Sequence, residues 1–394
     1  MAKSKDNPSK PRDPETEVVH GGRNPADQYG FVNTPVYRGS TVLFPTVASL
    51  EKRDQAYFYG RHDSPTQKAL RETICELEGG AVTMLTPSGL SAIAAALLAL
   101  VQAGDHILVT DSIYGPARGF CDQVLTKLGV ETTYYDPLIG GGIAELMNAR
   151  TRLVFTESPG SLTFETQDLP AISQAAHKAG AVVVLDNTWA TPLYFKPFEH
   201  GADVSIQAAT KYIIGHADGL LGTVTANPQT ADAIKQTHGD LGLCPGSEDT
   251  FLALRGLRTL AVRLERHWRS GLEMAHWFKA RPEVARVLHP ALEDDPGHAI
   301  WARDFTGACG LFSIILKPCS QAAIEAMLNG LELFGMGWSW GGFESLVVPF
   351  DSTLVRTATK WQAEGPGLRF HIGLENVEDL KADLDEGFER LRAT

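Results

Sequence analysis

Short apolar segments alternate with longer amphipathic segments between residues 82 and 226. The short segments are near-continuous apolar runs, as in strands buried on both faces, and the longer ones have helical periodicity. The last two strands follow one another without room for a helix. This pattern predicts βαβ units and a mostly parallel sheet of seven strands flanked by helices. The strand segments are 82–87, 106–111, 131–136, 153–157, 181–186, 203–208 and 222–227, and the helical segments are 88–101, 114–129, 142–150 and 169–180.

The pattern changes after about residue 250. A long amphipathic stretch, residues 251–281, predicts one helix that ends near Pro282. Strands are then expected at 311–317, 344–349 and 368–373, and helices at 321–331 and 375–391. The sequence therefore predicts an α/β fold in which a large domain, residues 62–255, is followed by a smaller α+β domain, residues 256–394.

Composition narrows the class of protein. A chain of 394 residues exceeds what one core usually serves, and a net charge of −12 argues against a nucleic-acid partner. The longest apolar run, residues 92–101, is about half of the ~20 residues that span a bilayer. Residues 1–15 lack the apolar core of a secretory signal and are expected to form a disordered tail. The five cysteines show no metal-site spacing, so we expect no metal and a reducing cytoplasm.

Candidate chemistry gathers at one edge of the predicted sheet. Ligands of open parallel sheets bind beyond the carboxyl ends of the strands. At that edge the chain places a helix start with free N–H groups, a tyrosine, a carboxylate and a lysine within an apolar stretch, namely Ser88-Gly89-Leu90, Tyr114, Asp186 and Thr210-Lys211. Pyridoxal phosphate needs a Schiff-base lysine, an acid for its pyridine nitrogen and a phosphate site. The edge therefore predicts a pyridoxal-phosphate site.

Each of these residues also has a structural explanation. Lys211 could extend its amine to solvent, Asp186 could stabilise a turn, and Tyr114 could be a half-buried aromatic. Three other cofactor or metal signatures are absent from the chain: G-x-G-x-x-G after the first strand, G-x-x-x-x-G-K-[ST], and H-E-x-x-H. The joint arrangement therefore favours pyridoxal phosphate over a dinucleotide or a nucleoside triphosphate.

Ordered motifs from about residue 17 to the end resemble the cysteine/methionine-metabolism family of pyridoxal-phosphate enzymes, of fold type I. They are YGRHDSPTQKALRETICELEGG, TPSGLSAI, DSIYGPAR, ESPGS, VVVLDNTWATP, SIQAATKYIIGHADG, GWSWGGFESL and RFHIGLENVEDL. Within that family, ESPGS, ATKYIIGHAD and SWGGFES most resemble the bacterial cystathionine β-lyases.

The resemblance implies a role for each cofactor-binding residue. Lys211 would hold pyridoxal phosphate as a Schiff base, Asp186 would pair with the pyridine nitrogen, and Tyr114 would stack on the ring and assist proton transfer. The phosphate would be held by the N–H groups of Gly89 and Leu90 and by the hydroxyl of Thr210. Related proteins often carry a serine where Ala208 or Ala209 stands, which leaves Thr210 as the only nearby side-chain donor.

The resemblance also implies a substrate site and an assembly. Arg369 would bind the substrate α-carboxylate, helped by Ser339 and the backbone at Trp340; its structural alternative is an ion pair with a protein acid. Tyr59 and Arg61 would lie in an N-terminal extended segment, residues 1–61, that reaches the neighbouring subunit. There Tyr59 would also border the substrate. The assembly would be at least a dimer, and typically a homotetramer.

Two positions bear on the reaction. Trp338 stands where γ-lyases of the family tend to carry an acid, and Pro116 stands where methionine γ-lyases carry a cysteine. We therefore expect β-elimination from L-cystathionine, which yields homocysteine, pyruvate and ammonia in methionine biosynthesis, with other cysteine S-conjugates as further substrates. The alternative is γ-elimination or γ-replacement on the same scaffold.

Overall fold

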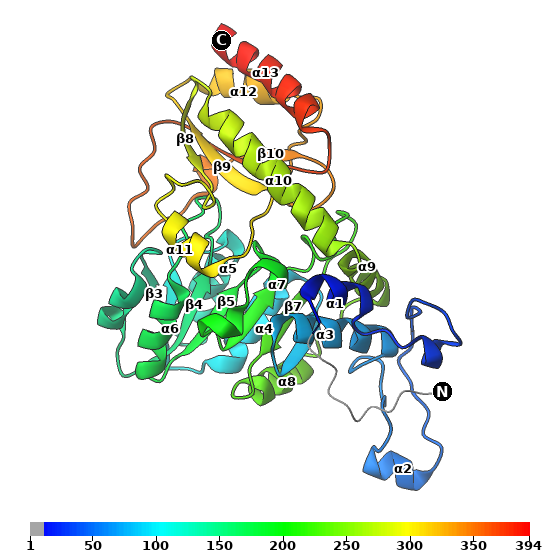
Figure 1. Ribbon diagram of the computed structural model, residues 1–394. Helices are drawn as coiled ribbons and strands as arrows, with labels where there is room; N and C mark the ends of the chain where they lie inside the picture. The colour runs from blue at the N-terminus through cyan, green and yellow to red at the C-terminus, as the bar shows by residue number, and fades with distance from the viewer. Residues whose placement is uncertain (1–11) are drawn as a thin grey trace.

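The computed structural model describes residues 12–394, and the sheet expected from the sequence is confirmed in it (Figure 1). Seven strands occur in the order β1-β7-β6-β5-β4-β2-β3. Only β7 is antiparallel, to both of its neighbours β1 and β6, because no helix separates it from β6. The strands are β1 (Val82–Thr86), β2 (His106–Thr110), β3 (Glu131–Tyr135), β4 (Thr151–Glu157), β5 (Val182–Asp186), β6 (Val204–Gln207) and β7 (Gly222–Ala226).

Helices cover both faces of this sheet. Alternate strand residues explain the arrangement: Leu108 packs into one core with α3, α6, α7, α9 and α10, whereas Ile107 and Val109 pack into another with α4, α5 and α8. The apolar runs of the sequence thus supply two cores at once. The helices are α3 (Pro65–Glu78), α4 (Gly89–Leu100), α5 (Gly115–Phe120), α6 (Leu169–Lys178), α7 (Thr191–Tyr194), α8 (Ala231–Asp240), α9 (Ser247–Leu257) and α10 (Leu260–Lys279).

A second, antiparallel sheet of order β10-β11-β9-β8 lies above the first in Figure 1. A third core lies between this sheet and helices α10, α12 and α13, while Leu311, Ile315 and Phe350 belong to the core of the large sheet. The two sheets are therefore bridged by one continuous apolar cluster. The elements are β8 (Val284–Leu288), α11 (His298–Asp304), β9 (Leu311–Leu316), α12 (Gln321–Asn329), β10 (Leu346–Pro349), β11 (Gly367–His371) and α13 (Val377–Ala393).

Several local predictions were wrong. The stretch 251–281 is two helices, α9 and α10, with a break at Arg258 and Thr259. The segment 114–129 passes from α5 into a π-helical turn, Cys121–Leu125, and 142–150 overlaps a 3₁₀ turn, Gly140–Leu146, in place of the expected helix. Strand β8 was missed because its run VARVL is short and follows a helix directly.

The N-terminal segment contains more structure than expected. Residues 1–11 of the predicted tail lie outside the described residues, but α1 (Pro14–His20) begins within it, capped by the Asp13 carboxylate, which accepts the Glu15 N–H at 3.0 Å. A 3₁₀ turn (Pro25–Gln28) and α2 (Val47–Lys52) follow. The domain divisions after residues 61 and 255 stay predictions; the second falls inside α9.

No helix within residues 12–394 combines the length and apolarity that a membrane crossing needs.

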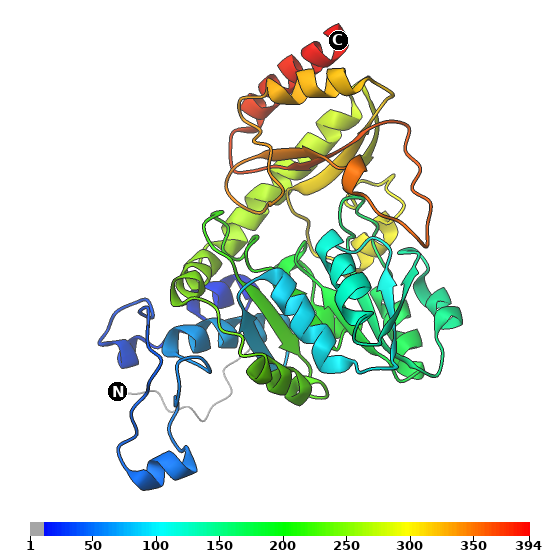
Figure 2. The same ribbon diagram turned by 180° about the vertical axis from the view of Figure 1, so that it is seen from behind.

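A segment after β10 descends from the small sheet to the large one (Figure 2). Its tip binds Asp111 at the end of β2: the backbone N–H groups of Thr357, Ala358 and Thr359 donate to this carboxylate at 2.8–3.1 Å. Arg118 donates to it at 2.6 Å, and both partners of this ion pair are buried. Burial raises the pKa of Asp111, but the hydrogen bonds from Thr357, Thr359 and Arg118 outweigh burial and hold it below its ordinary value. The buried Asp111 carboxylate thus ties the segment after β10 to the large sheet.

We expect Asp111→Asn to lower the free energy of unfolding by about 3 kcal/mol at pH 7, because Arg118 is left buried without its anion. Because the pKa of Asp111 is lower in the folded than in the unfolded state, its ionised carboxylate stabilises the fold at pH values above the unfolded-state pKa of about 4. This stabilisation is lost as the pH falls through the folded-state pKa and the carboxylate is protonated. The difference from the wild type should therefore narrow below about pH 4. Urea unfolding followed by tryptophan fluorescence measures both effects. The exposed Asp136→Asn should change stability by less than about 0.5 kcal/mol, and an equal loss in both variants would contradict the prediction.

Candidate active site

A pocket of about 220 Å³ lies at the carboxyl edge of the large sheet, where the sequence placed its candidate chemistry. Six of the predicted cofactor residues line it together: Gly89, Leu90, Tyr114, Asp186, Thr210 and Lys211. From the small domain, Trp338, Trp340 and Arg369 complete the wall. Segments far apart along the chain, such as those that carry Lys211 and Arg369, therefore enclose one site.

Lys211 follows β6 on a loop closed by hydrogen bonds from Lys211 N–H to Ala208 and from Gly215 N–H to Lys211. Its Nζ donates to Ser339 Oγ at 2.7 Å and lies 5.3 Å from the Trp340 ring centroid. Burial and the positive charge of Arg369 lower the pKa of Lys211 to about 8, and the Asp186 carboxylate acts in the opposite direction. The neutral fraction of this amine at physiological pH is therefore larger than that of an ordinary lysine.

Gly341 brings the small domain to the lysine. It has a left-handed φ of +83°, and a Cβ on it would lie 2.9 Å from the Lys211 carbonyl carbon and the Tyr212 nitrogen. Only glycine meets both conditions without displacement of the Lys211 backbone. The close approach places Ser339 and Trp340, immediately before Gly341, against the amine.

Asp186 and Glu157 form a carboxylate pair at the ends of neighbouring strands. They are register partners in the parallel pair β4–β5, and both line the pocket. The Thr188 hydroxyl and N–H donate to Asp186 Oδ1 at 2.5 and 3.0 Å, whereas Glu157 Oε2 accepts the Tyr114 N–H at 2.7 Å. Burial raises the pKa of both groups, and the negative charge of Asp186 raises that of Glu157 further. Thr188 and Lys211 keep the charge on Asp186, so Glu157 is the member that takes the proton.

The start of α4 presents free donors to the same pocket. Ser88 caps the helix by accepting the Ser91 N–H, and within the described residues the N–H groups of Gly89 and Leu90 have no partner. The Thr210 hydroxyl lines the pocket but accepts the Leu221 N–H at 3.0 Å and donates to its carbonyl at 3.2 Å. An anion at this helix start would thus meet backbone donors first.

Arg369 is buried on β11 and aims its guanidinium at the loop that carries the two tryptophans. Nη2 donates to the carbonyls of Trp338 and Ser339 at 2.9 and 3.3 Å. No carboxylate in the described part of the chain lies within ion-pair distance of Arg369, although many other arginines form such pairs. The alternative explanation for Arg369, an ion pair with an acid of the protein, therefore does not hold among the described residues.

Two predicted residues lie elsewhere. Tyr59 and Arg61 do not line this pocket; the Arg61 guanidinium donates to the Gly239 carbonyl at 3.2 Å and lies 5.9 Å from the Tyr59 ring centroid. Sequence reasoning in turn missed Glu157 and gave Thr188 no role. The position of Glu157 at the end of a predicted strand, level with Asp186, was the signal that could have identified it.

The chain matches known proteins over nearly its whole length. The family model described as Cys/Met metabolism PLP-dependent enzyme matches residues 15–389. A putative cystathionine beta-lyase of Rhizobium johnstonii is 52% identical over 95% of both chains, and a cystathionine beta-lyase of Salmonella typhimurium is 43% identical over 96% of this chain and 98% of that one.

A solved structure of similar shape is the cystathionine gamma synthase of Xanthomonas oryzae in complex with cystathionine. It superposes with a TM-score of 0.90 at 33% identity, over 98% of this chain and 100% of the other. Fold, site and full-length match agree, and the chain belongs to the Cys/Met metabolism family of PLP-dependent enzymes.

Proposed function

We propose that this protein is a cystathionine β-lyase, a PLP-dependent carbon–sulfur lyase that converts L-cystathionine to L-homocysteine, pyruvate and ammonia in methionine biosynthesis. The observation that carries the proposal is the convergence of the Lys211 amine, the Asp186 carboxylate and the Arg369 guanidinium on one pocket. The names of the relatives from Rhizobium johnstonii and Salmonella typhimurium support the reaction type.

The residues of the pocket fit pyridoxal phosphate. The unpartnered N–H groups of Gly89 and Leu90 suit its phosphate, Asp186 suits its pyridine nitrogen, and the half-exposed Tyr114 ring suits stacking. The Thr210 hydroxyl joins the phosphate contacts if it leaves Leu221. When bound to Lys211, the cofactor supplies an electron sink for the pair left at the substrate Cα.

The chain's own residues then bind and deprotonate the substrate. Arg369 holds the α-carboxylate through two parallel N–H···O bonds, a contact that also neutralises its buried charge. The neutral amine of Lys211 accepts the Cα proton, and Ser339 Oγ, 2.7 Å from Nζ, orients it. Tyr114 assists proton transfer from the other side. Ser339 and the backbone at Trp340 help to bind the α-carboxylate, and the apolar rings of Trp338 and Trp340 limit the access of water to this contact.

The N-terminal segment supports a shared active site. Large apolar side chains project from it into solvent; Tyr29 is 98% exposed and Leu43 is 84% exposed. Such side chains gain stability when another subunit covers them. We propose that Tyr59 and Arg61 reach the phosphate and substrate of a neighbouring subunit, in a homotetramer. We also place the enzyme in the cytoplasm, where its five free cysteines stay reduced.

Two extensions concern the substrate. Other cysteine S-conjugates share the leaving sulfur at Cβ, and we propose that the enzyme cleaves them as well. The second candidate activity is γ-elimination or γ-replacement, which the similarity to the Xanthomonas oryzae γ-synthase favours. Trp338 argues for β-elimination because it brings an indole, and no acid, to the rim beside Arg369.

Product analysis tests the reaction. Purified holoenzyme with L-cystathionine should release pyruvate and homocysteine in equal amounts, measured by chromatography. Dominant 2-oxobutyrate and cysteine would assign the γ-lyase activity instead, and the absence of all four products would reject a lyase.

Replacement of Lys211 tests the cofactor attachment. Borohydride reduction of the wild type should fix the cofactor on the peptide that contains Lys211, as detected by mass spectrometry. Lys211→Ala should give no such adduct and lose more than about 10³-fold in kcat, since both the covalent link and the base are removed. The exposed Lys235→Ala serves as the matched control and should behave as the wild type. An adduct on another lysine would refute the assignment.

Replacement of Arg369 separates substrate binding from cofactor binding. Arg369→Lys should reduce kcat/KM for L-cystathionine by about 10- to 100-fold, because a lysine cannot form the paired hydrogen bonds. The visible absorbance of the bound cofactor should be retained. The exposed Arg266→Lys should stay within twofold of the wild type. Loss of the cofactor in Arg369→Lys, or an unchanged kcat/KM, would contradict the role.

A further inference from the structure

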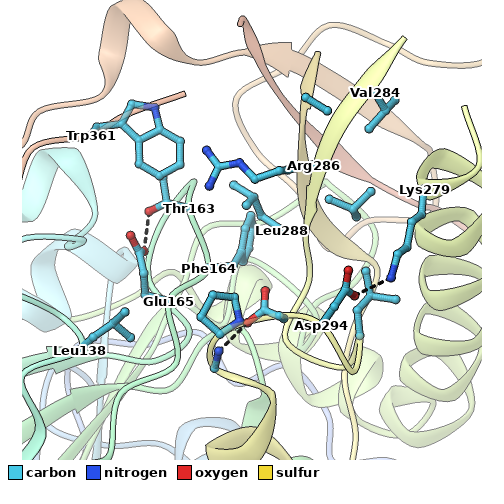
Figure 3. Close-up of a pocket in the computed structure, with 16 residues that line it drawn as sticks. Leu138, Thr163, Phe164, Glu165, Lys279, Val284, Arg286, Leu288, Asp294 and Trp361 are labelled. Carbon is cyan, nitrogen blue, oxygen red and sulfur yellow. Dashed lines mark hydrogen bonds and ion pairs between the residues drawn. The ribbon is translucent and has the colours of Figure 1, made fainter. Parts of the chain in front are cut away.

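A second cavity, of about 400 Å³, opens between the two sheets (Figure 3). Its walls come from residues 163–165 after β4, from β8, from the loop 292–297 and from Trp361. It shares only Phe164 with the pocket around Lys211. The volume lies within the range of about 300–1,000 Å³ that is usual for small-molecule sites.

Four of the five charged side chains that line this cavity are already paired. Lys279 Nζ lies 2.6 Å from Asp294 Oδ1, an ion pair drawn as a dashed line in Figure 3. Arg286 Nε donates to Glu364 at 2.9 Å, and Glu165 accepts from Arg356 at 2.9 Å. These pairs leave no net charge of their own on the wall.

Asp295 is the exception. Its Oδ1 accepts the Gly297 N–H at 2.8 Å, but within residues 12–394 no lysine, arginine or histidine lies within ion-pair distance. Burial raises the pKa of this carboxyl to about 6; the Gly297 N–H opposes the rise, Glu165 and Asp294 add to it, and His298 opposes it. The cavity therefore contains one carboxylate, Asp295, that has no ion-pair partner among residues 12–394.

The remaining wall is mainly apolar. Phe164 and Leu288 lie side by side at the centre of the cavity in Figure 3, and Val284, Leu292 and Leu138 extend this surface. A partly buried anion such as Asp295 is stabilised by a cation, and an apolar wall is stabilised by an apolar body. An occupant that satisfies both carries a positive charge at one end and hydrocarbon over the rest.

We propose that this cavity is a binding site for a small organic cation, a protonated amine on an apolar body. The amine faces Asp295, and the body packs on Phe164 and Leu288. The site is distinct from the one that holds the substrate α-carboxylate, and it stands independently of which carbon–sulfur bond the enzyme breaks.

Phe164 connects the two sites. Its backbone has a left-handed φ of 58°, and its ring is buried. Its neighbours Thr163 and Glu165 both accept hydrogen bonds from Arg356, which fixes the turn. An occupant of the cavity thus contacts a side chain that also lines the wall of the Lys211 pocket.

Calorimetric titration of the holoenzyme with N,N-dimethyl-2-phenylethylamine tests the site. This tertiary amine is protonated at neutral pH and cannot condense with the cofactor aldehyde. We expect saturable binding of one molecule per chain, at least tenfold tighter than that of the neutral 2-phenylethanol. Absence of saturable binding, or equal affinity for the alcohol, would overturn the proposal.

Two variants locate the binding. Asp295→Asn keeps the acceptor for Gly297 and should weaken amine binding at least tenfold, about 1.4 kcal/mol. Glu293→Gln, an exposed position in the same loop that does not line the cavity, should stay within twofold of the wild type. Cofactor absorbance in both variants shows that the active site is intact. Unchanged affinity in Asp295→Asn, or an equal loss in both, places the amine elsewhere and refutes the site.

A third variant covers the case in which Asp295→Asn does not fold. Leu138 is half-exposed at the edge of the cavity, so Leu138→Trp should be tolerated while it narrows the space. Amine affinity should fall at least fivefold in this variant. An unchanged affinity would show that the amine does not enter the cavity.

Discussion

The site is organised around an amine that has been removed from water beside a guanidinium. Lys211 and Arg369 carry like charges into one pocket; burial makes both charges costly, and the charge of Arg369 adds to the cost at Lys211. The cost falls when the lysine amine becomes neutral or forms a covalent bond, and when the arginine receives a carboxylate. Both are the states that the proposed chemistry requires. The apolar and small residues around Lys211 are therefore part of its activation.

Asp186 and Glu157, the carboxylate pair of the same pocket, also carry like charges, in this case negative, that repel each other. Two acids at one register position cannot both ionise readily in a buried site. Two hydrogen bonds from Thr188 and the Lys211 charge favour the anion on Asp186, and a proton on Glu157 relieves the repulsion. Glu157 also accepts the Tyr114 N–H, so the residue that takes the proton positions the aromatic ring as well.

Neither set of groups would meet without the contacts that join the two sheets. Gly341 approaches the Lys211 backbone, the segment 357–359 surrounds the buried Asp111, and a continuous apolar cluster fills the space between the sheets. The second cavity lies in this same joint. There the packing leaves a cavity, and no cationic side chain among residues 12–394 pairs with Asp295. The contacts between the two sheets thus enclose the Lys211 pocket and leave the second cavity open.

The sequence alone determined the seven-stranded sheet and the edge at which its chemistry gathers. Near-continuous apolar strands specify burial on both faces, and parallel strands bring their carboxyl ends together. The same reasoning failed where periodicity carries no signal: the break at Thr259, the short β8, and the π-helical and 3₁₀ turns. Only the tertiary structure decided that Arg369 pairs with no acid in the described part of the chain, that Glu157 lies beside Asp186, and that the Thr210 hydroxyl is bound to Leu221. These facts depend on distances between segments far apart in the chain, and local composition cannot encode such distances.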